Sequence, residues 1–133
     1  MDQDLTVLLV DDSPDDRYFF RRAISRAGLR TTLFEAEDGE EAIDYLMQQG
    51  RFGDSAAFPR PDVIFLDLNM PGRNGFDMLR WLQTQPYRNE LRVVVISGSN
   101  EPHDRALAAE LGANGYLVKP ATTQKIEQEL TGS

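Results

Sequence analysis

Five polar residues each follow a short apolar segment of the chain, at or next to the point where that segment ends. If these segments are parallel strands, their carboxyl ends share one edge of a sheet, and the five residues meet there. Ligands of open α/β sheets bind at that edge. The residues are, in chain order, Asp11, Asp12, Asp67, Ser97 and Lys119.

Three carboxylates in one place repel one another, and this cost favours either protonation or a bound cation. Mg²⁺ prefers oxygen ligands and is typically held by one or two carboxylates together with phosphate oxygens. A carboxylate can also attack phosphorus and form an aspartyl phosphate. The lysine would supply a positive charge and the serine a hydroxyl donor, and phosphoryl transfer mainly requires such positioning and neutralisation. The residue types therefore indicate a site for Mg²⁺ and a phosphoryl group.

Short apolar runs alternate with segments of helical periodicity, which is the pattern of β-α units. The strands are expected at residues 5–10, 33–36, 63–66, 93–96 and 116–118. They are continuous apolar runs rather than alternations, so helices should cover both faces of the sheet. Ser13, Asp38 and Asn100 are the expected N-caps of the first, second and fourth helices. The predicted fold class is α/β, with a five-stranded parallel sheet between helices.

The composition excludes several classes of protein. The chain has 133 residues, no cysteine and a net charge of −8. Disulfides, zinc–thiolate sites and cysteine nucleophiles are therefore excluded, and the acidic balance argues against a nucleic-acid partner. No apolar run approaches the roughly 20 residues of a membrane span, and the acidic start lacks the features of a secretory signal. We expect a cytoplasmic protein with one domain over residues 1–133 and no membrane partner.

Three stretches of the chain together resemble the receiver domain of bacterial two-component response regulators. They are residues 7–13 (VLLVDDS), 62–72 (DVIFLDLNMPG) and 112–120 (GANGYLVKP). The resemblance covers residues 5–130, and its motifs occur in order at the ends of the expected strands. It implies a five-stranded parallel sheet in the order 2-1-3-4-5, with helices on both faces.

The resemblance also implies roles for the acidic residues. Asp67 would accept a phosphoryl group from the phosphohistidine of a sensor histidine kinase. Asp12 and Asp67 would bind Mg²⁺ through side-chain oxygens. Asn69 would add its backbone carbonyl, and Asp11 would act through a metal-bound water. The protein would then be a phosphoacceptor of signalling rather than an enzyme, although it would assist its own phosphorylation and dephosphorylation.

Further roles implied by the resemblance concern the phosphate and its readout. Ser97 would hydrogen-bond one phosphoryl oxygen, and Lys119 would pair with another. Tyr116 would move as Ser97 is drawn toward the phosphate. The resemblance, and the need to turn Lys119 toward Asp67, also predict a cis peptide bond before Pro120, although only about 5–6% of X–Pro bonds in folded proteins are cis.

A finer resemblance is to single-domain response regulators paired with bacterial phytochrome kinases. It rests on the long connection at residues 50–61 and the stretch at residues 97–102, together with our expectation that no effector domain is present. Two features depart from the usual receiver pattern, namely Ala121 in place of an aromatic residue and a short last helix. We expect output through another protein, and a homodimer that uses the fourth helix, fifth strand and fifth helix.

Two other functions fit parts of the pattern. A Mg²⁺-dependent phosphatase of the haloacid-dehalogenase type resembles this site, but it carries a second Asp two residues after the nucleophile, where this chain has Asn69. A flavin-binding protein of similar topology would need a Ser-, Thr- or Gly-rich phosphate loop after the first strand. Residues 11–16 are mostly acidic and would repel a phosphate.

Two surface features have both a structural and a functional interpretation. The connection at residues 50–61 is either a loop held by Phe52 and Phe58 or a contact for a partner. The arginines of the first helix form either a solvated face or, as the resemblance suggests, a surface that docks the kinase. They are Arg17, Arg21, Arg22 and Arg26.

Overall fold

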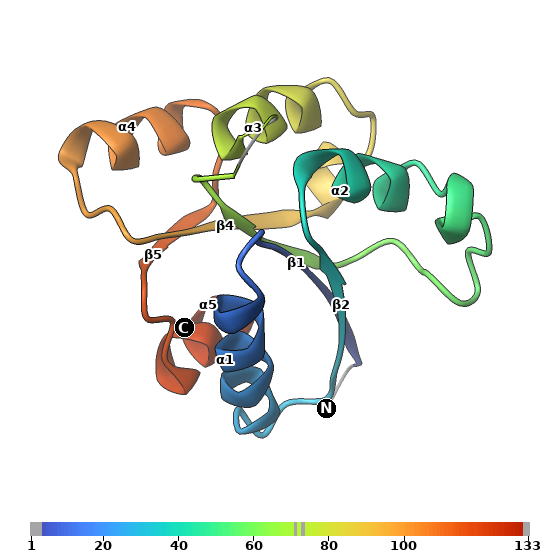
Figure 1. Cartoon of the computed structure of the whole chain (residues 1–133), viewed down its shortest axis with the longest axis horizontal. Helices are drawn as coiled ribbons and strands as arrows, with labels where there is room; N and C mark the ends of the chain where they lie inside the picture. The colour runs from blue at the N-terminus through green and yellow to red at the C-terminus, as the bar shows by residue number, and fades with distance from the viewer. Residues whose placement is uncertain (1–3, 71, 73, 132–133) are drawn as a thin grey trace.

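A parallel sheet of five strands lies at the centre of the molecule, with helices on both sides (Figure 1). The computed structural model describes residues 4–70, 72 and 74–131. The strand order is β2-β1-β3-β4-β5, so the predicted fold class and the order implied by the resemblance are confirmed. The strands are β1 (Leu5–Val10), β2 (Thr31–Ala36), β3 (Val63–Asp67), β4 (Arg92–Ser97) and β5 (Gly115–Val118).

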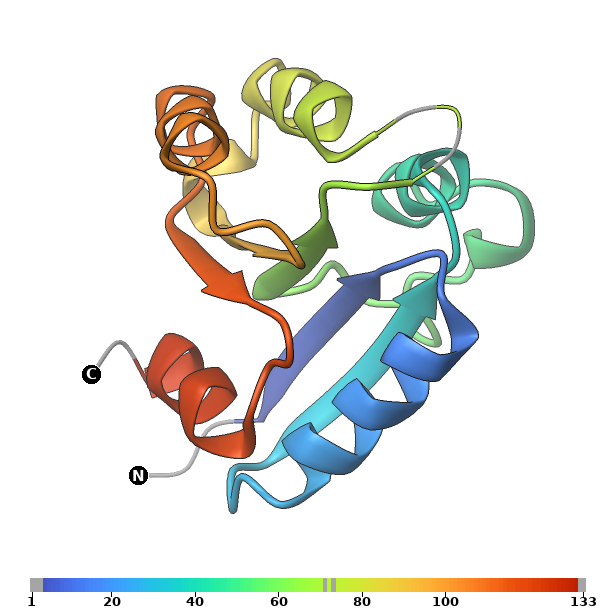
Figure 2. The ribbon, with the colours of Figure 1, turned by 60° about the vertical axis from the view of Figure 1, so that its left-hand side comes forward.

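The helices divide between the two faces of the sheet, with α1 and α5 on one face and α2, α3 and α4 on the other (Figure 2). None of the helices in the described part of the chain combines the length and the apolar composition that crossing a membrane requires. Two single-turn helices, η1 (Gly50–Phe52) and η2 (Arg88–Glu90), lie in connections. The longer helices are α1 (Pro14–Ser25), α2 (Gly39–Leu46), α3 (Gly75–Gln83), α4 (Pro102–Glu110) and α5 (Thr123–Thr131).

Each face of the sheet has its own apolar core. Phe20 of α1 and Ile126 of α5 pack in a cluster with Phe65 of β3. On the opposite face, Leu79 of α3 lies in a cluster with Ile64 of the same strand. Every residue of β3 is buried, which explains why its sequence is a continuous apolar run rather than an alternation.

The register of the strands brings the candidate site residues to one edge. Val10 lies opposite Leu66, so the residues that follow β1 lie beside Asp67 at the end of β3. Asp67 in turn lies opposite Ile96, which makes Ser97 its diagonal neighbour on β4. Because Ser97 pairs with Val118, Lys119 begins the connection after β5 at the same edge.

The residues at the N-termini of α1, α2 and α4 can be compared with the N-caps predicted from the sequence. Ser13 accepts a hydrogen bond from the amide of Asp16, and Asp38 caps α2 in the same way, so both predictions are confirmed. The prediction for Asn100 is wrong, because the residue before the first turn of α4 is Glu101. Proline at the first helical position holds the preceding residue in extended backbone, which fixes Glu101 as the cap.

The connection at residues 50–61 is held to the body of the protein by aromatic side chains. Phe52 is buried and lies 5.1 Å from both Tyr45 and Phe58, measured between ring centroids. The Tyr45 hydroxyl donates a 2.7 Å hydrogen bond to the carbonyl of Pro59. These contacts confirm the structural interpretation of this segment. They leave the partner-contact interpretation as a prediction.

Candidate functional site

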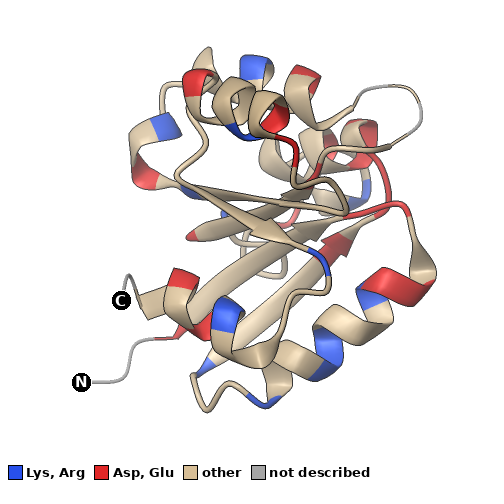
Figure 3. Ribbon diagram, turned by 90° about the vertical axis from the view of Figure 1, so that its left-hand side faces the viewer, with Lys and Arg blue, Asp and Glu red and all other residues tan. Residues whose placement is uncertain are grey.

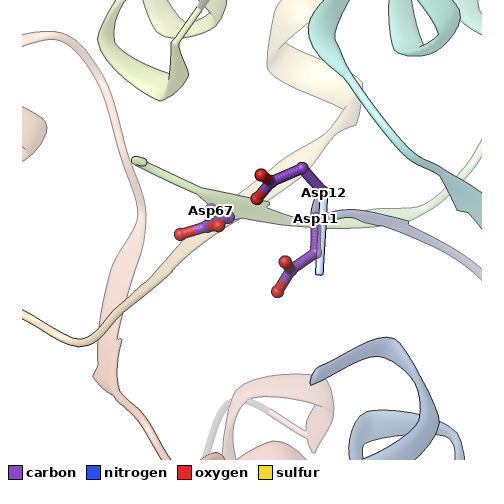
Figure 4. Close-up of side chains that lie close together, drawn as sticks. All are labelled: Asp11, Asp12 and Asp67. Carbon is purple, nitrogen blue, oxygen red and sulfur yellow. The ribbon is translucent and has the colours of Figure 1, made fainter. Parts of the chain in front are cut away.

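Three aspartates meet at the carboxyl edge of the sheet (Figure 4). One carboxylate oxygen from each of Asp11, Asp12 and Asp67 lies within 4.8 Å of the other two. Asp11 and Asp67 are 1% and 3% exposed, whereas Asp12 is exposed. The cluster is therefore open to solvent on the Asp12 side and closed beneath it.

Local backbone contacts fix the two buried carboxylates. The amide of Ser13 donates to Asp11 Oδ1 at 2.9 Å, and the amide of Asn69 donates to Asp67 Oδ1 at 3.3 Å. Gly75 lies against the backbone of Asp67, since a Cβ atom on Gly75 would be only 2.6 Å from the Asp67 carbonyl oxygen. A residue without a side chain is therefore required at the start of α3 for β3 to end where it does.

Lys119 reaches this cluster from the end of β5. Its Nζ atom lies 3.1 Å from Asp11 Oδ2 and 3.6 Å from Asp67 Oδ2. A fourth carboxylate lies closer still, because Asp16 Oδ2 accepts a 2.7 Å hydrogen bond from Nζ. Asp16 was not singled out from the sequence and was considered only within the acidic stretch of residues 11–16. Its place in the first turn of a helix that begins beside Asp11 and Asp12 was the available signal.

The surroundings of the site change its ionisation. Burial raises the pKa of Asp67 from the ordinary 3.8 to about 6. The charges of Asp11 and Asp12 act in the same direction, whereas Lys119 and the amide of Asn69 favour the carboxylate. For Lys119 the strongest single influence is burial, which opposes the charge. The hydrogen bond to Asp16 and the nearby carboxylates outweigh it, so the pKa of Lys119 is raised.

The donor set fits a hard divalent cation. Asp11 Oδ2 is buried and accepts no hydrogen bond from any described residue, although it lies 3.1 Å from Lys119 Nζ. The contact with Lys119 is ionic, so Asp11 Oδ2 retains a lone pair for a cation. Carboxylate oxygens are the ligands that Mg²⁺ prefers. The three aspartates are thus able to hold it, and the predicted role of the Asn69 carbonyl stays a prediction.

Ser97 and Tyr116 are joined through one residue of the β4–α4 connection. The buried Ser97 Oγ accepts a 3.0 Å hydrogen bond from the amide of Ser99. The Tyr116 hydroxyl donates to the carbonyl of the same Ser99 at 2.9 Å. The guanidinium of Arg105 lies 4.7 Å from the centre of the Tyr116 ring. Ser97 and Tyr116 thus both hydrogen-bond to the backbone of Ser99.

The connection after β5 has a fixed backbone shape. The peptide bond between Lys119 and Pro120 is cis. The amide of Lys119 donates to the carbonyl of Ser97 at 2.7 Å, which continues the β4–β5 pairing by one residue. Figure 3 shows red, acidic stretches of ribbon in connections at this edge of the sheet, as well as on several helices.

The arginines of α1 are not all free on the surface. Glu35 of β2 pairs with Arg17 at 3.2 Å and with Arg21 at 2.7 Å. Arg17 also donates to the carbonyl of Asp11 at 2.8 Å. Two members of the predicted basic face thus hold α1 against β2, and Arg17 supports the backbone of the site.

Comparison with known proteins agrees with this geometry. The family model of the response regulator receiver domain matches residues 7–131. The chain belongs to this family. It is 40% identical over 114 residues to the nitrate/nitrite response regulator protein NarL of Escherichia coli (strain K12), covering 86% of this chain and 47% of NarL. The receiver chain thus spans about half the length of that relative.

Other relatives have similar length. Response regulator Rcp1 of Synechocystis sp. is 31% identical over 126 residues, covering 95% of this chain and 84% of Rcp1. The phosphorylated cyanobacterial phytochrome response regulator RcpA superposes with a TM-score of 0.81 at 29% identity, covering 98% of this receiver and 91% of RcpA. The bacteriophytochrome response regulator AtBRR superposes with a TM-score of 0.84 at 29% identity, covering 97% of this receiver and 91% of AtBRR. The finer resemblance to phytochrome-linked regulators is thereby confirmed.

Proposed function

We propose that this receiver domain accepts a phosphoryl group on Asp67 from a phosphohistidine of a sensor histidine kinase, in a reaction that needs Mg²⁺. The observation that carries the proposal is the convergence of Asp11, Asp12 and Asp67 within 4.8 Å, with Lys119 Nζ 3.6 Å from Asp67. Nucleophile, metal ligands and a positive charge are the parts that phosphoryl transfer requires.

In the proposed step, a carboxylate oxygen of Asp67 forms a bond to phosphorus while the phosphorus–nitrogen bond of the donor breaks. The imidazole leaves with the electron pair of that bond. Mg²⁺ would neutralise charge on the transferred phosphoryl oxygens. Lys119 supplies a second positive charge, and the buried Ser97 offers a hydroxyl next to Asp67 on the neighbouring strand. The same parts would assist hydrolysis of the aspartyl phosphate.

The proposed output is a change in the β4–α4 connection. We propose that Ser97 Oγ moves toward a phosphoryl oxygen, and that this movement breaks the hydrogen bond it accepts from the amide of Ser99. The carbonyl of Ser99 is the acceptor for the Tyr116 hydroxyl, so the two events are coupled through one peptide unit. Phosphorylation of Asp67 would thereby shift the balance between two conformations of the surface formed by α4 and β5.

The proposed partner is a histidine kinase of the phytochrome type. Its support is the similarity to the phytochrome response regulator RcpA and the bacteriophytochrome response regulator AtBRR. Beside the site, Phe19 and Tyr18 of α1 are 64% and 45% exposed. A hollow of about 100 Å³ between α1 and the β5–α5 connection has Lys119, Phe19 and Ala121 on its walls. An exposed apolar patch next to a reactive group suits a partner that brings its own histidine there.

We also propose a homodimer through the face made by α4, β5 and α5. A groove of about 180 Å³ runs along α4 and β5, lined mainly by small side chains next to Arg105 and Tyr116. A self-complementary two-fold contact is the commonest way for one surface to associate with itself. Because Tyr116 lines the groove, the phosphorylation state would affect this contact.

Incubation with acetyl phosphate and Mg²⁺, followed by intact-mass measurement, tests the proposed chemistry. Wild type should gain one phosphoryl group, and chelation of the metal should prevent the gain. The Asp67→Asn variant should gain none, while Asp62→Asn, which alters an exposed acid at the opposite end of β3, should react like wild type. Equal gain by the Asp67→Asn variant would refute the proposal.

A further inference from the structure

The closest partner of Lys119 is not among the three clustered aspartates. Asp16 Oδ2 lies 2.7 Å from Nζ, compared with 3.1 Å for Asp11 and 3.6 Å for Asp67. Among the described residues within 4.0 Å of Nζ, Asp16 is the one acid outside the proposed Mg²⁺ ligands. A cation bound by Asp11 and Asp67 would neutralise part of their negative charge. Asp16 would then be the carboxylate that still pairs with Lys119 alone.

The position of Asp16 is fixed by the fold rather than by chance. Its amide donates to Ser13 Oγ at 3.2 Å, so it stands in the first turn of α1 directly above the end of β1. The Asp16 side chain is 41% exposed and the Lys119 side chain 22% exposed. The pair therefore sits on the rim of the site, between the buried carboxylates and solvent.

The ammonium group has three N–H donors, so it does not have to leave Asp16 to reach a phosphoryl group on Asp67. What Asp16 changes is the field at the phosphoryl oxygens, because its negative charge offsets part of the positive charge of Lys119. The carboxylate also holds the flexible lysine in one position. The two effects are separable, since an asparagine at position 16 keeps a hydrogen-bond acceptor but loses the charge.

We propose that Asp16 is a positioning residue that shares Lys119 with the phosphoacceptor and limits how tightly the site holds a phosphoryl group. This inference rests on the proposed function and goes beyond it, because it assigns a role to a residue outside the metal cluster. Removal of the negative charge of Asp16 is expected to strengthen the attraction between Lys119 and an anion bound at Asp67.

The test is the affinity for beryllofluoride, a phosphoryl mimic, measured by calorimetry in the presence of Mg²⁺. Asp16→Asn should bind it roughly threefold to tenfold more tightly than wild type, as expected for one unit charge a few ångströms away in partly solvated surroundings. Asp15→Asn is the matched control. It makes the same charge change in the same turn of α1, but Asp15 is exposed and is not within 4.0 Å of Nζ.

Two further variants distinguish this role from a structural one. Asp16→Glu restores the charge and should return the affinity toward that of wild type. In a Lys119→Met background, Asp16→Asn should lose its effect, because the double-mutant cycle isolates the coupling between the two side chains. If Asp16→Asn and Asp15→Asn give the same affinity, or if the Asp16→Asn effect persists without Lys119, the inference is wrong.

The proposed function is tested separately in the same preparation. If wild type gains no phosphoryl group from acetyl phosphate, the proposed function fails. If wild type gains one on Asp67 and the charge at Asp16 has no influence on beryllofluoride, only the role of Asp16 fails.

Discussion

The carboxylate of Asp67 is expected to destabilise the fold at neutral pH when no cation is bound. Burial, together with the charges of Asp11 and Asp12, raises the pKa of Asp67 from 3.8 to about 6. A raised pKa means that the folded protein binds this proton more tightly than the unfolded chain does. The folded state therefore loses stability as the pH rises from about 4 to about 6.

The size of this effect follows from the shift. One pKa unit corresponds to about 1.4 kcal/mol, so a rise from 3.8 to about 6 amounts to roughly 3 kcal/mol at pH 8. The attraction of Lys119 is already included in that shift. An Asp67→Asn substitution removes the charge while keeping the shape of the side chain. We expect it to raise the free energy of unfolding at pH 8 by about 1 to 3 kcal/mol.

Urea unfolding in the presence of a chelator measures this gain. At pH 5 the gain should fall to roughly half of its value at pH 8, because wild-type Asp67 is then mostly protonated in the folded state. Added Mg²⁺ should also narrow the difference, since it stabilises the folded wild type by binding to the intact cluster.

Glu127→Gln is the control for the change in net charge. Glu127 is an exposed residue of α5, and its substitution should change stability by less than about 0.5 kcal/mol at either pH. An Asp67→Asn variant that is no more stable than wild type at pH 8 in chelator would show that the Asp67 carboxylate does not destabilise the fold. A gain in stability that does not depend on pH would show the same.

Three further predictions concern the framework and the surface. Gly75→Ala should lower the free energy of unfolding by about 1–3 kcal/mol and slow phosphorylation, because its Cβ would lie 2.6 Å from the Asp67 carbonyl oxygen. Urea unfolding measures the first effect, and intact mass measures the second. Phe52→Ala should cost about 3–5 kcal/mol yet leave beryllofluoride affinity unchanged. Sedimentation velocity should show a dimer when beryllofluoride is bound, and a monomer in both states at tens of micromolar, roughly the range of weak association, would exclude the proposed homodimer.

The sequence was sufficient to predict the five strands of the sheet and most of the site residues at its carboxyl edge. Continuous apolar runs marked β1, β3 and β4 because both faces of these strands are covered. The strand β2 was harder, since it begins at Thr31, two residues before the apolar residues that marked it. Its outer positions are less buried, so hydrophobicity alone gave a weaker signal there.

Contacts between segments far apart in the chain could not be predicted from the sequence. The hydrogen bond between Lys119 and Asp16 joins residues 103 positions apart. They come together because α1 packs against α5 and next to the connection that precedes it. Ser99 was likewise not singled out as the residue between Ser97 and Tyr116. Its role depends on which backbone atoms face the tyrosine hydroxyl, and residue type does not encode this. The misplaced cap at Asn100 shows the reverse case, in which the proline that follows Glu101 was the stronger signal.

The position of the phosphoryl group tests the central claim most directly. The protein is phosphorylated with acetyl phosphate and Mg²⁺, the acyl phosphate is reduced with borohydride, and the modified residue is located by peptide mass spectrometry. We predict that residue 67 alone is modified, in proportion to the phosphoryl group measured on the intact protein. Modification at His103 or at a serine, with Asp67 unchanged, would contradict it.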